Sequence, residues 1–229
     1  MGYPALCLSP PAKSPQPRGG PLSEPDTHRF PAKPLPKQPP SNQPTPLTPP
    51  TPSPQPLITG SNTNEGAGFV SFTPTGPGSS TLFNLTESVI ACPVAQEVKN
   101  RNRVGLPTYR YQYAGNFSNI SPVSWFGAYH SAELPLLFGT HSEYRGPSTQ
   151  FEWDVSYAME ALWLSFAEDP SRGPVRLAIG DAPANPNNGS YFAWPQFEQG
   201  EDDMLLFAEG GTLMQLVGSG RIDDYCTGL

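Results

Sequence analysis

His130 is the residue of this sequence whose type and setting best suit acid–base chemistry. It follows residues 115–127, which are rich in Gly, Asn, Ser and Pro and predict a loop, and it precedes an apolar run over 131–138. Catalytic histidines are commonly carried on such loops, and a histidine can change its charge near neutral pH. A surface-loop or core histidine without a chemical role is the alternative that the local pattern leaves open.

Glu65 is the second candidate, because a carboxylate can orient a histidine in a charge-relay set. It is the one acidic residue between Asp26 and Glu87, and it lies in a polar turn, residues 61–66, that follows the apolar stretch 57–60. A solvated carboxylate with no partner is the alternative interpretation of the same pattern.

Periodicity predicts the elements that must carry these residues. Residues 57–60 and 108–113 are predicted as strands, and residues 83–103 as a helix in which Pro93 marks a break or a new first turn. Residues 151–168 predict a second helix with Ser148 or Thr149 as its N-cap. Its apolar stripe consists of Val155, Met159, Leu162, Trp163 and Phe166.

The remaining stretches are predicted as short or irregular structure. Residues 203–209 and 212–217 predict two strands of a hairpin around Gly210-Gly211. We expect loops or turns over 66–80, 140–150 and 182–189, and a polar tail over 221–226.

The first 56 residues differ in composition from the rest of the chain. They hold 19 of the 31 prolines and few aromatic residues, so they cannot bury enough apolar surface to order themselves. We therefore expect a disordered proline-rich segment over 1–56. Its PxxP spacings, such as Pro31–Pro34 and Pro46–Pro49, would suit the aromatic groove of an SH3-type partner.

Several classes of function are disfavoured by charge and motif content. The chain carries a net charge of −7, and an acidic body disfavours nucleic acid as a partner. There is no apolar run of the ~18 residues that a transmembrane helix needs. Neither zinc-ligand spacing nor a phosphate-binding glycine motif occurs, so no metal or cofactor is expected, and Gly-x-Ser-x-Gly, the motif that carries a serine nucleophile, is also missing.

The sequons and the cysteines give information about the cellular compartment of the protein. Asn-x-Ser/Thr sequons occur at Asn84, Asn116, Asn119 and Asn188, and would favour a secreted protein with glycans on surface loops. The first residues do not have the pattern of a signal peptide, so the localisation stays open. Cys92 and Cys226 could form a disulfide or be two reduced, buried thiols, and Cys7 lies in the proline-rich segment.

In several segments the chain resembles the type B carboxylesterase family, which includes cholinesterases and many fungal lipases and esterases. The family's acid-bearing turn is similar to LITGSNTNEGAGF, and its histidine segment to YRYQYAGNF and WFGAYHSAELPLLFG. The family's next helix is similar to FEWDVSYAMEALWLSFAEDPSRGP, and its WPxY segment is similar to WPQFEQGEDDMLLF. The two halves of its C-terminal disulfide are similar to IACPVAQEV and RIDDYC. The resemblance spans about residues 57–226, with Asn64 where the family usually has Asp.

The resemblance implies an α/β-hydrolase fold, with Glu65 as the catalytic acid, His130 as the general base and a disulfide between Cys92 and Cys226. Nothing in the chain matches the family's nucleophile or its glycine-rich oxyanion loop. We therefore expect residues 57–229 to form the C-terminal part of an α/β-hydrolase domain.

Two functions remain in view from the sequence. The first is a carboxylic ester hydrolase, acting on a small-molecule or lipid ester, that keeps the acid and the histidine but lacks the nucleophile region and is inactive as written. The alternative is a non-catalytic, esterase-like binding module or pseudoenzyme with a proline-rich interaction arm.

Overall fold

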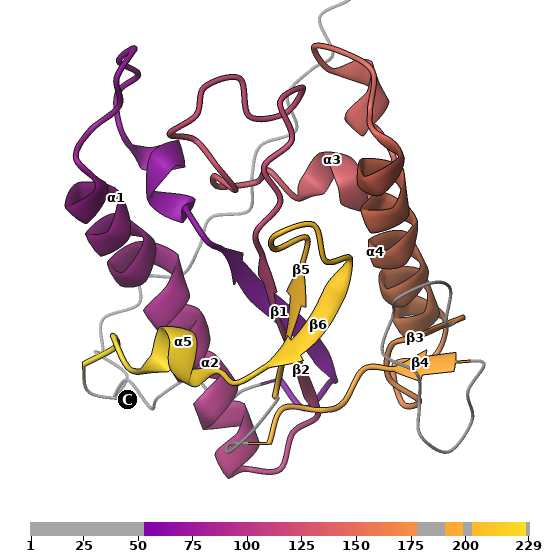
Figure 1. Ribbon diagram of the computed structural model, residues 1–229. Coiled ribbons are helices and arrows are strands. Elements are labelled where there is room, and N and C mark those ends of the chain that lie inside the picture. The colour runs from indigo at the N-terminus through magenta and orange to yellow at the C-terminus, as the bar shows by residue number, and fades with distance from the viewer. Residues whose placement is uncertain (1–52, 178–190, 199–202, 228–229) are drawn as a thin grey trace, which may run out of the picture. The chain divides into compact units, whose positions relative to one another are not determined.

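The structure is a computed structural model that describes residues 53–177, 191–198 and 203–227 (Figure 1). The PxxP spacings and the turn expected over 182–189 lie outside these residues. Residues 53–56 precede the first strand, and the buried guanidinium of Arg101 donates to the backbone oxygens of Ser53, at 2.8 Å, and Gln55.

A four-stranded sheet forms the centre, in the order β1 (Leu57–Asn62), β2 (Thr108–Tyr113), β5 (Met204–Phe207) and β6 (Met214–Val217). β1 and β5 both pair in parallel with β2, and β6 is antiparallel to β5 across the predicted hairpin. Because β1 and β2 are parallel, their carboxyl ends meet at one edge of the sheet. The turn with Glu65 and the loop that leads to His130 leave from that edge.

One face of the sheet is covered by a helical stretch that starts at residue 79, earlier than predicted. α1 (Ser79–Thr86) continues through a π-helical turn (Glu87–Ala91) into α2 (Cys92–Arg103). Pro93 lies in the first turn of α2, where a missing backbone N–H is tolerated. Of the two alternatives predicted for Pro93, a break or a new first turn, the structure has the first turn of α2, preceded by a widened π-helical turn.

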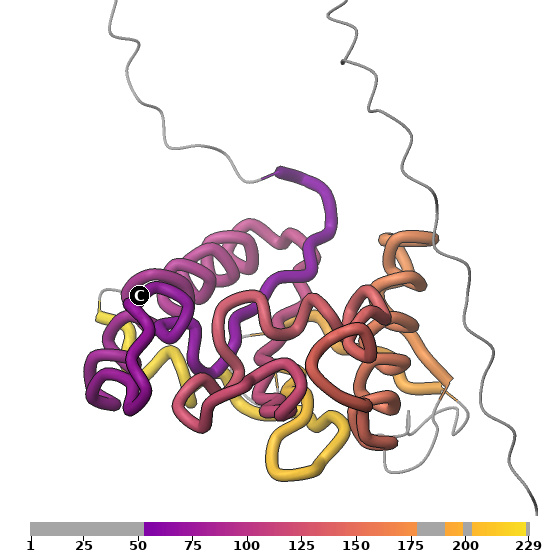
Figure 2. The backbone as a smooth tube through the Cα atoms, turned by 90° about the horizontal axis from the view of Figure 1, so that it is seen from above, coloured from indigo at the N-terminus to yellow at the C-terminus, as the bar shows by residue number. Residues whose placement is uncertain are grey.

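The other face is covered by α4 (Gln150–Glu168), so that α1 and α2 lie on one side of the sheet and α4 on the other (Figures 1 and 2). Thr149 is the N-cap, and its Oγ1 accepts from the Glu152 N–H at 3.1 Å. The short helix α3 (Leu134–Leu137) is tied to α4 by Ser156, whose Oγ donates to the Leu136 carbonyl oxygen at 2.6 Å. Parallel strands with helices on both faces confirm the α/β class.

The main core lies between the sheet and α4, and a smaller one is formed by Ala91 of the π-helical turn, Met204 of β5 and Ile222 near the end of the chain. Val155, Met159 and Leu162 of the predicted stripe are fully buried in the main core. Three of the elements were not predicted. They are the antiparallel strands β3 (Val175–Leu177) and β4 (Tyr191–Ala193), and the helix α5 (Gly220–Asp223), which lies where a polar tail was expected. Within the described ranges, no helix combines the length and the apolar character that spanning a membrane requires.

Candidate active site

Glu65 opens a short 3-10 helix (Glu65–Phe69) just after β1, and its carboxylate is almost fully buried. Each carboxylate oxygen has its own partner. The backbone N–H of Asn62 donates to Oε1 at 2.7 Å, and His130 Nδ1 lies 2.7 Å from Oε2. The two candidates proposed from the sequence are therefore in direct contact.

The pKa of Glu65 is raised above its ordinary value, mainly because burial removes water from the carboxylate. The hydrogen bonds from Asn62 and His130 oppose this shift, and the nearby charge of Glu133 adds to it. The hydrogen bonds to a buried carboxylate of this kind are strengthened, because no solvent competes for its oxygens.

Asn64 holds the acid turn against the histidine loop. Its backbone N–H donates to the Ala128 carbonyl oxygen at 3.0 Å. Its side-chain Nδ2 donates to the carbonyl oxygens of Trp125, at 2.8 Å, and Phe126, at 2.7 Å. The residue before Glu65 thus binds the residues before His130, and this fixes the approach of the two functional side chains.

A second tie comes from Asn62, the last residue of β1. Its Nδ2 donates to the Tyr129 carbonyl oxygen at 2.7 Å and to the carboxylate of Glu133. Tyr129, just before His130, and Glu133, three residues after it, are therefore both bonded to the last residue of β1. Sequence reasoning did not assign these roles to the two asparagines, although both lie within three residues of Glu65 in the polar turn predicted over 61–66.

Close packing places the imidazole over the acid turn. A side chain at Gly68 would have its Cβ only 2.5 Å from the Cβ of His130, so this position requires glycine. The ring of Phe69 lies 4.8 Å from the imidazole, measured between centroids. Ser131, next to His130, has a φ of 70°, a strained conformation for a residue other than glycine and one that is common at functional sites.

The arrangement suits general base chemistry. An ionised carboxylate can only accept hydrogen bonds, so the contact with Glu65 places the proton of the neutral imidazole on Nδ1 and leaves Nε2 as the base. The His130 side chain is 43% exposed, whereas that of Glu65 is 5% exposed. None of the hydrogen bonds among the described residues involves Nε2, so this nitrogen is open to a substrate or a nucleophile.

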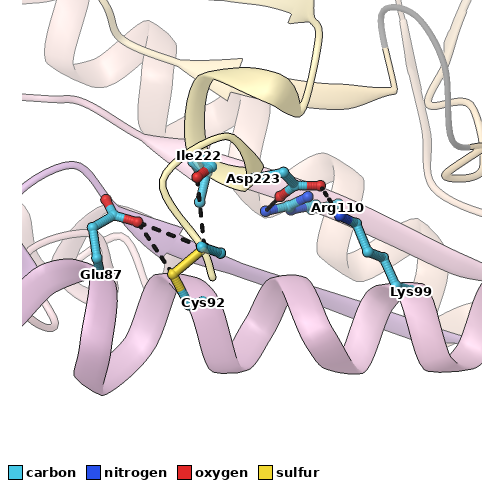
Figure 3. Close-up of a disulfide and its surroundings, with 7 residues drawn as sticks. Glu87, Cys92, Lys99, Arg110, Ile222 and Asp223 are labelled. Carbon is cyan, nitrogen blue, oxygen red and sulfur yellow. Dashed lines mark hydrogen bonds and ion pairs between the residues drawn. A yellow bond between two sulfur atoms is a disulfide. The ribbon is translucent and has the colours of Figure 1, made fainter. Parts of the chain in front are cut away.

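The two folded-part cysteines form a disulfide between the start of α2 and the residues after α5 (Figure 3). Their Cα atoms are 5.4 Å apart. Glu87 points at the same sulfurs, but these are bonded to each other, so this group is not a metal site in the oxidised chain. Cys7 lies outside the described residues.

The structure separates the four sequons. Asn84 on α1 and Asn116 in the loop after β2 are exposed. Asn119, in contrast, is 5% exposed, and its amide nitrogen lies within hydrogen-bond distance of three acceptors that a glycan there would have to displace. Asn188 lies outside the described residues.

Comparisons with known proteins agree on one family. The model of the carboxylesterase family matches residues 79–219, a range that includes His130 and Cys92. A chlorogenic acid esterase of Aspergillus niger is 81% identical over 142 residues, which are 62% of this chain and 28% of that protein. Secreted lipase 5 of Gibberella zeae is 46% identical over 127 residues, 51% of this chain and 23% of its own length. The chain therefore spans about a quarter of the length of these relatives.

Proposed function

The chain belongs to the carboxylesterase family, and we propose that Glu65 and His130 are the acid and the base of its ester-hydrolysing relay. The observation that carries this proposal is the 2.7 Å contact between His130 Nδ1 and Glu65 Oε2, with Nε2 left open. In the serine-hydrolase template, a histidine held in this way takes a proton from a serine hydroxyl and returns it to the leaving alcohol.

The relay needs a nucleophile that these residues do not supply. Gly-x-Ser-x-Gly is missing from the 229 residues, and nothing in them matches the oxyanion loop. A carboxylate–histidine pair alone can at best activate water, and most of the rate in this template requires the triad and the oxyanion donors acting together. We propose that the chain does not hydrolyse esters by itself and that its relay works when a segment bearing the nucleophile is present.

The same missing motif supports a second candidate, a non-catalytic binding module of esterase ancestry. The two candidates differ in what they require of the site. A binding module has no need for Glu65 to hold His130 in one tautomer, whereas the relay depends on it.

The test has two steps. In the first, the soluble chain and its His130→Ala variant are assayed with a short-chain nitrophenyl ester, and neither should exceed the background rate. Turnover by the unmodified chain that disappears in His130→Ala would contradict the proposal, because the nucleophile would then lie within these residues.

In the second step the chain is co-expressed with the complementary part of the Aspergillus niger relative, which carries the remaining length of that protein. Ester hydrolysis, tested with chlorogenic acid and with the nitrophenyl ester, should appear. It should be lost in His130→Ala and should fall by about 10⁴-fold in Glu65→Gln, where the imidazole takes the wrong tautomer. A well-folded complex without activity would favour the binding module.

A further inference from the structure

We infer that Asn119, His141 and Glu152 form a positioning cluster that fixes both ends of the loop carrying His130 to helix α4. This inference rests on the proposed function, because it assigns the cluster a role in holding the base against its acid. The loop runs from Asn119 to His141, and His130 lies at its middle. The two ends are joined directly, since Asn119 Nδ2 donates to the His141 carbonyl oxygen at 3.1 Å.

Glu152, in the first turn of α4, joins these ends to the helix. Asn119 Nδ2 donates to Glu152 Oε1 at 2.9 Å, and His141 Nδ1 lies 3.4 Å from the same oxygen. Ser148, just before the helix, lies 2.6 Å from His141 Nδ1 through its Oγ. Because α4 contributes the fully buried Val155, Met159 and Leu162 to the main core, the ends of the loop are attached to a rigid element.

Burial makes the cluster sensitive to the loss of one member. Asn119, His141 and Glu152 are 5%, 0% and 1% exposed, so water cannot replace a missing partner. The Asn119 amide is the closest side-chain donor to the Glu152 carboxylate. Without it, the carboxylate would keep only the longer contact with His141 and the favourable field at the start of α4.

The cluster is separate from the hydrogen bonds that Asn62 and Asn64 make with the histidine loop. Asn62 and Asn64 fix residues 125–129 to the end of β1, whereas the cluster fixes residues 119 and 141 to α4. The position of His130 is therefore set from two separate elements. A cluster that served only the fold would change stability without moving His130 relative to Glu65, and this difference can be measured.

The measurement is the proton resonance of His130 Nδ1–H in chain labelled with ¹⁵N-histidine, assigned by its loss in His130→Gln. The unmodified chain should show a sharp, strongly downfield signal because Nδ1 is bonded to Glu65. In Asn119→Ala the signal should broaden or disappear. Asn116→Ala is the matched control, since Asn116 is exposed three residues before this loop, and it should leave the signal unchanged.

A swap tests the contact itself. Asn119→Asp sets two carboxylates against each other and should abolish the signal. Asn119→Asp with Glu152→Gln restores the contact between residues 119 and 152 with donor and acceptor reversed, but not the donor to the His141 carbonyl oxygen, so it should recover only part of the signal. Recovery supports the inference. An unchanged signal in folded Asn119→Ala overturns it.

The remaining outcomes are also decisive. If both Asn119→Ala and the swap fail to fold, the cluster belongs to the fold alone and the inference is overturned. If the unmodified, folded chain lacks the signal, the Glu65–His130 pairing fails, and with it the proposed function. This last result is distinct from a failure of the cluster, because it does not depend on any variant.

Discussion

Glu65 and Glu87 are both partly or wholly withdrawn from water, yet their carboxylates have different surroundings. Glu65 receives one donor on each oxygen, and these are the contacts that define the candidate site. Glu87 faces the disulfide, with Cys92 Sγ 3.5 Å from its Oε2 (Figure 3). A disulfide carries no proton to donate, so the carboxylate of Glu87 is desolvated without an equivalent partner there.

Glu87 should therefore make stability depend on pH. Burial raises the pKa of Glu87 above its ordinary value; the charge of Arg110 opposes this and that of Asp223 adds to it. Because the folded-state pKa lies above the unfolded one, the protonated carboxyl stabilises the fold at acidic pH, and this contribution is lost as the pH rises through the raised pKa.

The test compares urea unfolding of the unmodified chain and of Glu87→Gln at mildly acidic and at neutral pH. Glutamine cannot ionise, so the unfolding free energy of Glu87→Gln should rise relative to that of the unmodified chain as the pH increases. An identical difference at both pH values would mean that Glu87 titrates alike in the folded and unfolded chain.

At the scale of elements, α4 is the helix on which the main core and the loop of His130 both depend. Leu162 is fully buried in that core, whereas Leu164, two residues later, is 62% exposed. Leu162→Ala should lower the unfolding free energy by about 2–5 kcal/mol, because it removes buried methyl groups and leaves a cavity. Leu164→Ala is the matched control and should change it by no more than about 0.5 kcal/mol.

Denaturant unfolding of both variants checks this assignment of faces. Similar losses for the two leucines would place the apolar face of α4 elsewhere than the structure does. The far-ultraviolet circular dichroism of both variants before unfolding shows whether the helix itself is retained.

The strongest periodic patterns predicted their elements well. The strand predicted over 108–113 has the same bounds as β2, although its alternating residue types indicated a half-buried strand and β2 is buried at almost every position. The apolar stripe together with the capping threonine predicted α4 to within one residue. The three-residue strands β3 and β4 were missed because so short a segment carries no period, and the π-helical turn was missed because its spacing departs from 3.6 residues.

The candidate site, like the fold, could be predicted only in part from the sequence. The contact between Glu65 and His130 was predicted through a family resemblance, and the structure has that contact. The roles of Asn62, Asn64 and Asn119 in holding the histidine loop were not predicted, because an asparagine that bonds to distant residues looks the same in the sequence as one in a turn. Its sequon led to Asn119 being assigned to the surface as a glycan acceptor. A sequon is recognised from three consecutive residues, whereas burial depends on the whole fold.

At the scale of the whole molecule, β1 is an edge strand of the described sheet and is paired only with β2 there. Parallel strands are usually covered on both faces and lie inside a sheet, and the free N–H and C=O groups of an edge strand can pair with another segment. The chain spans 28% of the length of its Aspergillus niger relative. Under the proposed function, the edge of β1 is where a segment bearing the nucleophile would pair, next to the turn with Glu65.

The disulfide links two parts of the molecule that share little packing. Cys92 and Cys226 are separated by 134 residues, and the core beside them is small, with Ala91, Met204 and Ile222 as its buried members. A cross-link over so long a span chiefly restricts the unfolded chain, so its removal favours unfolding. The double variant Cys92→Ser/Cys226→Ser should lose about 2–4 kcal/mol of unfolding free energy, measured by denaturant titration. The unmodified chain in a reducing buffer should lose a similar amount, whereas the double variant should not respond to the reductant. If the unmodified chain kept its full stability after complete reduction, confirmed by thiol labelling, packing alone would hold the end of the chain against α2.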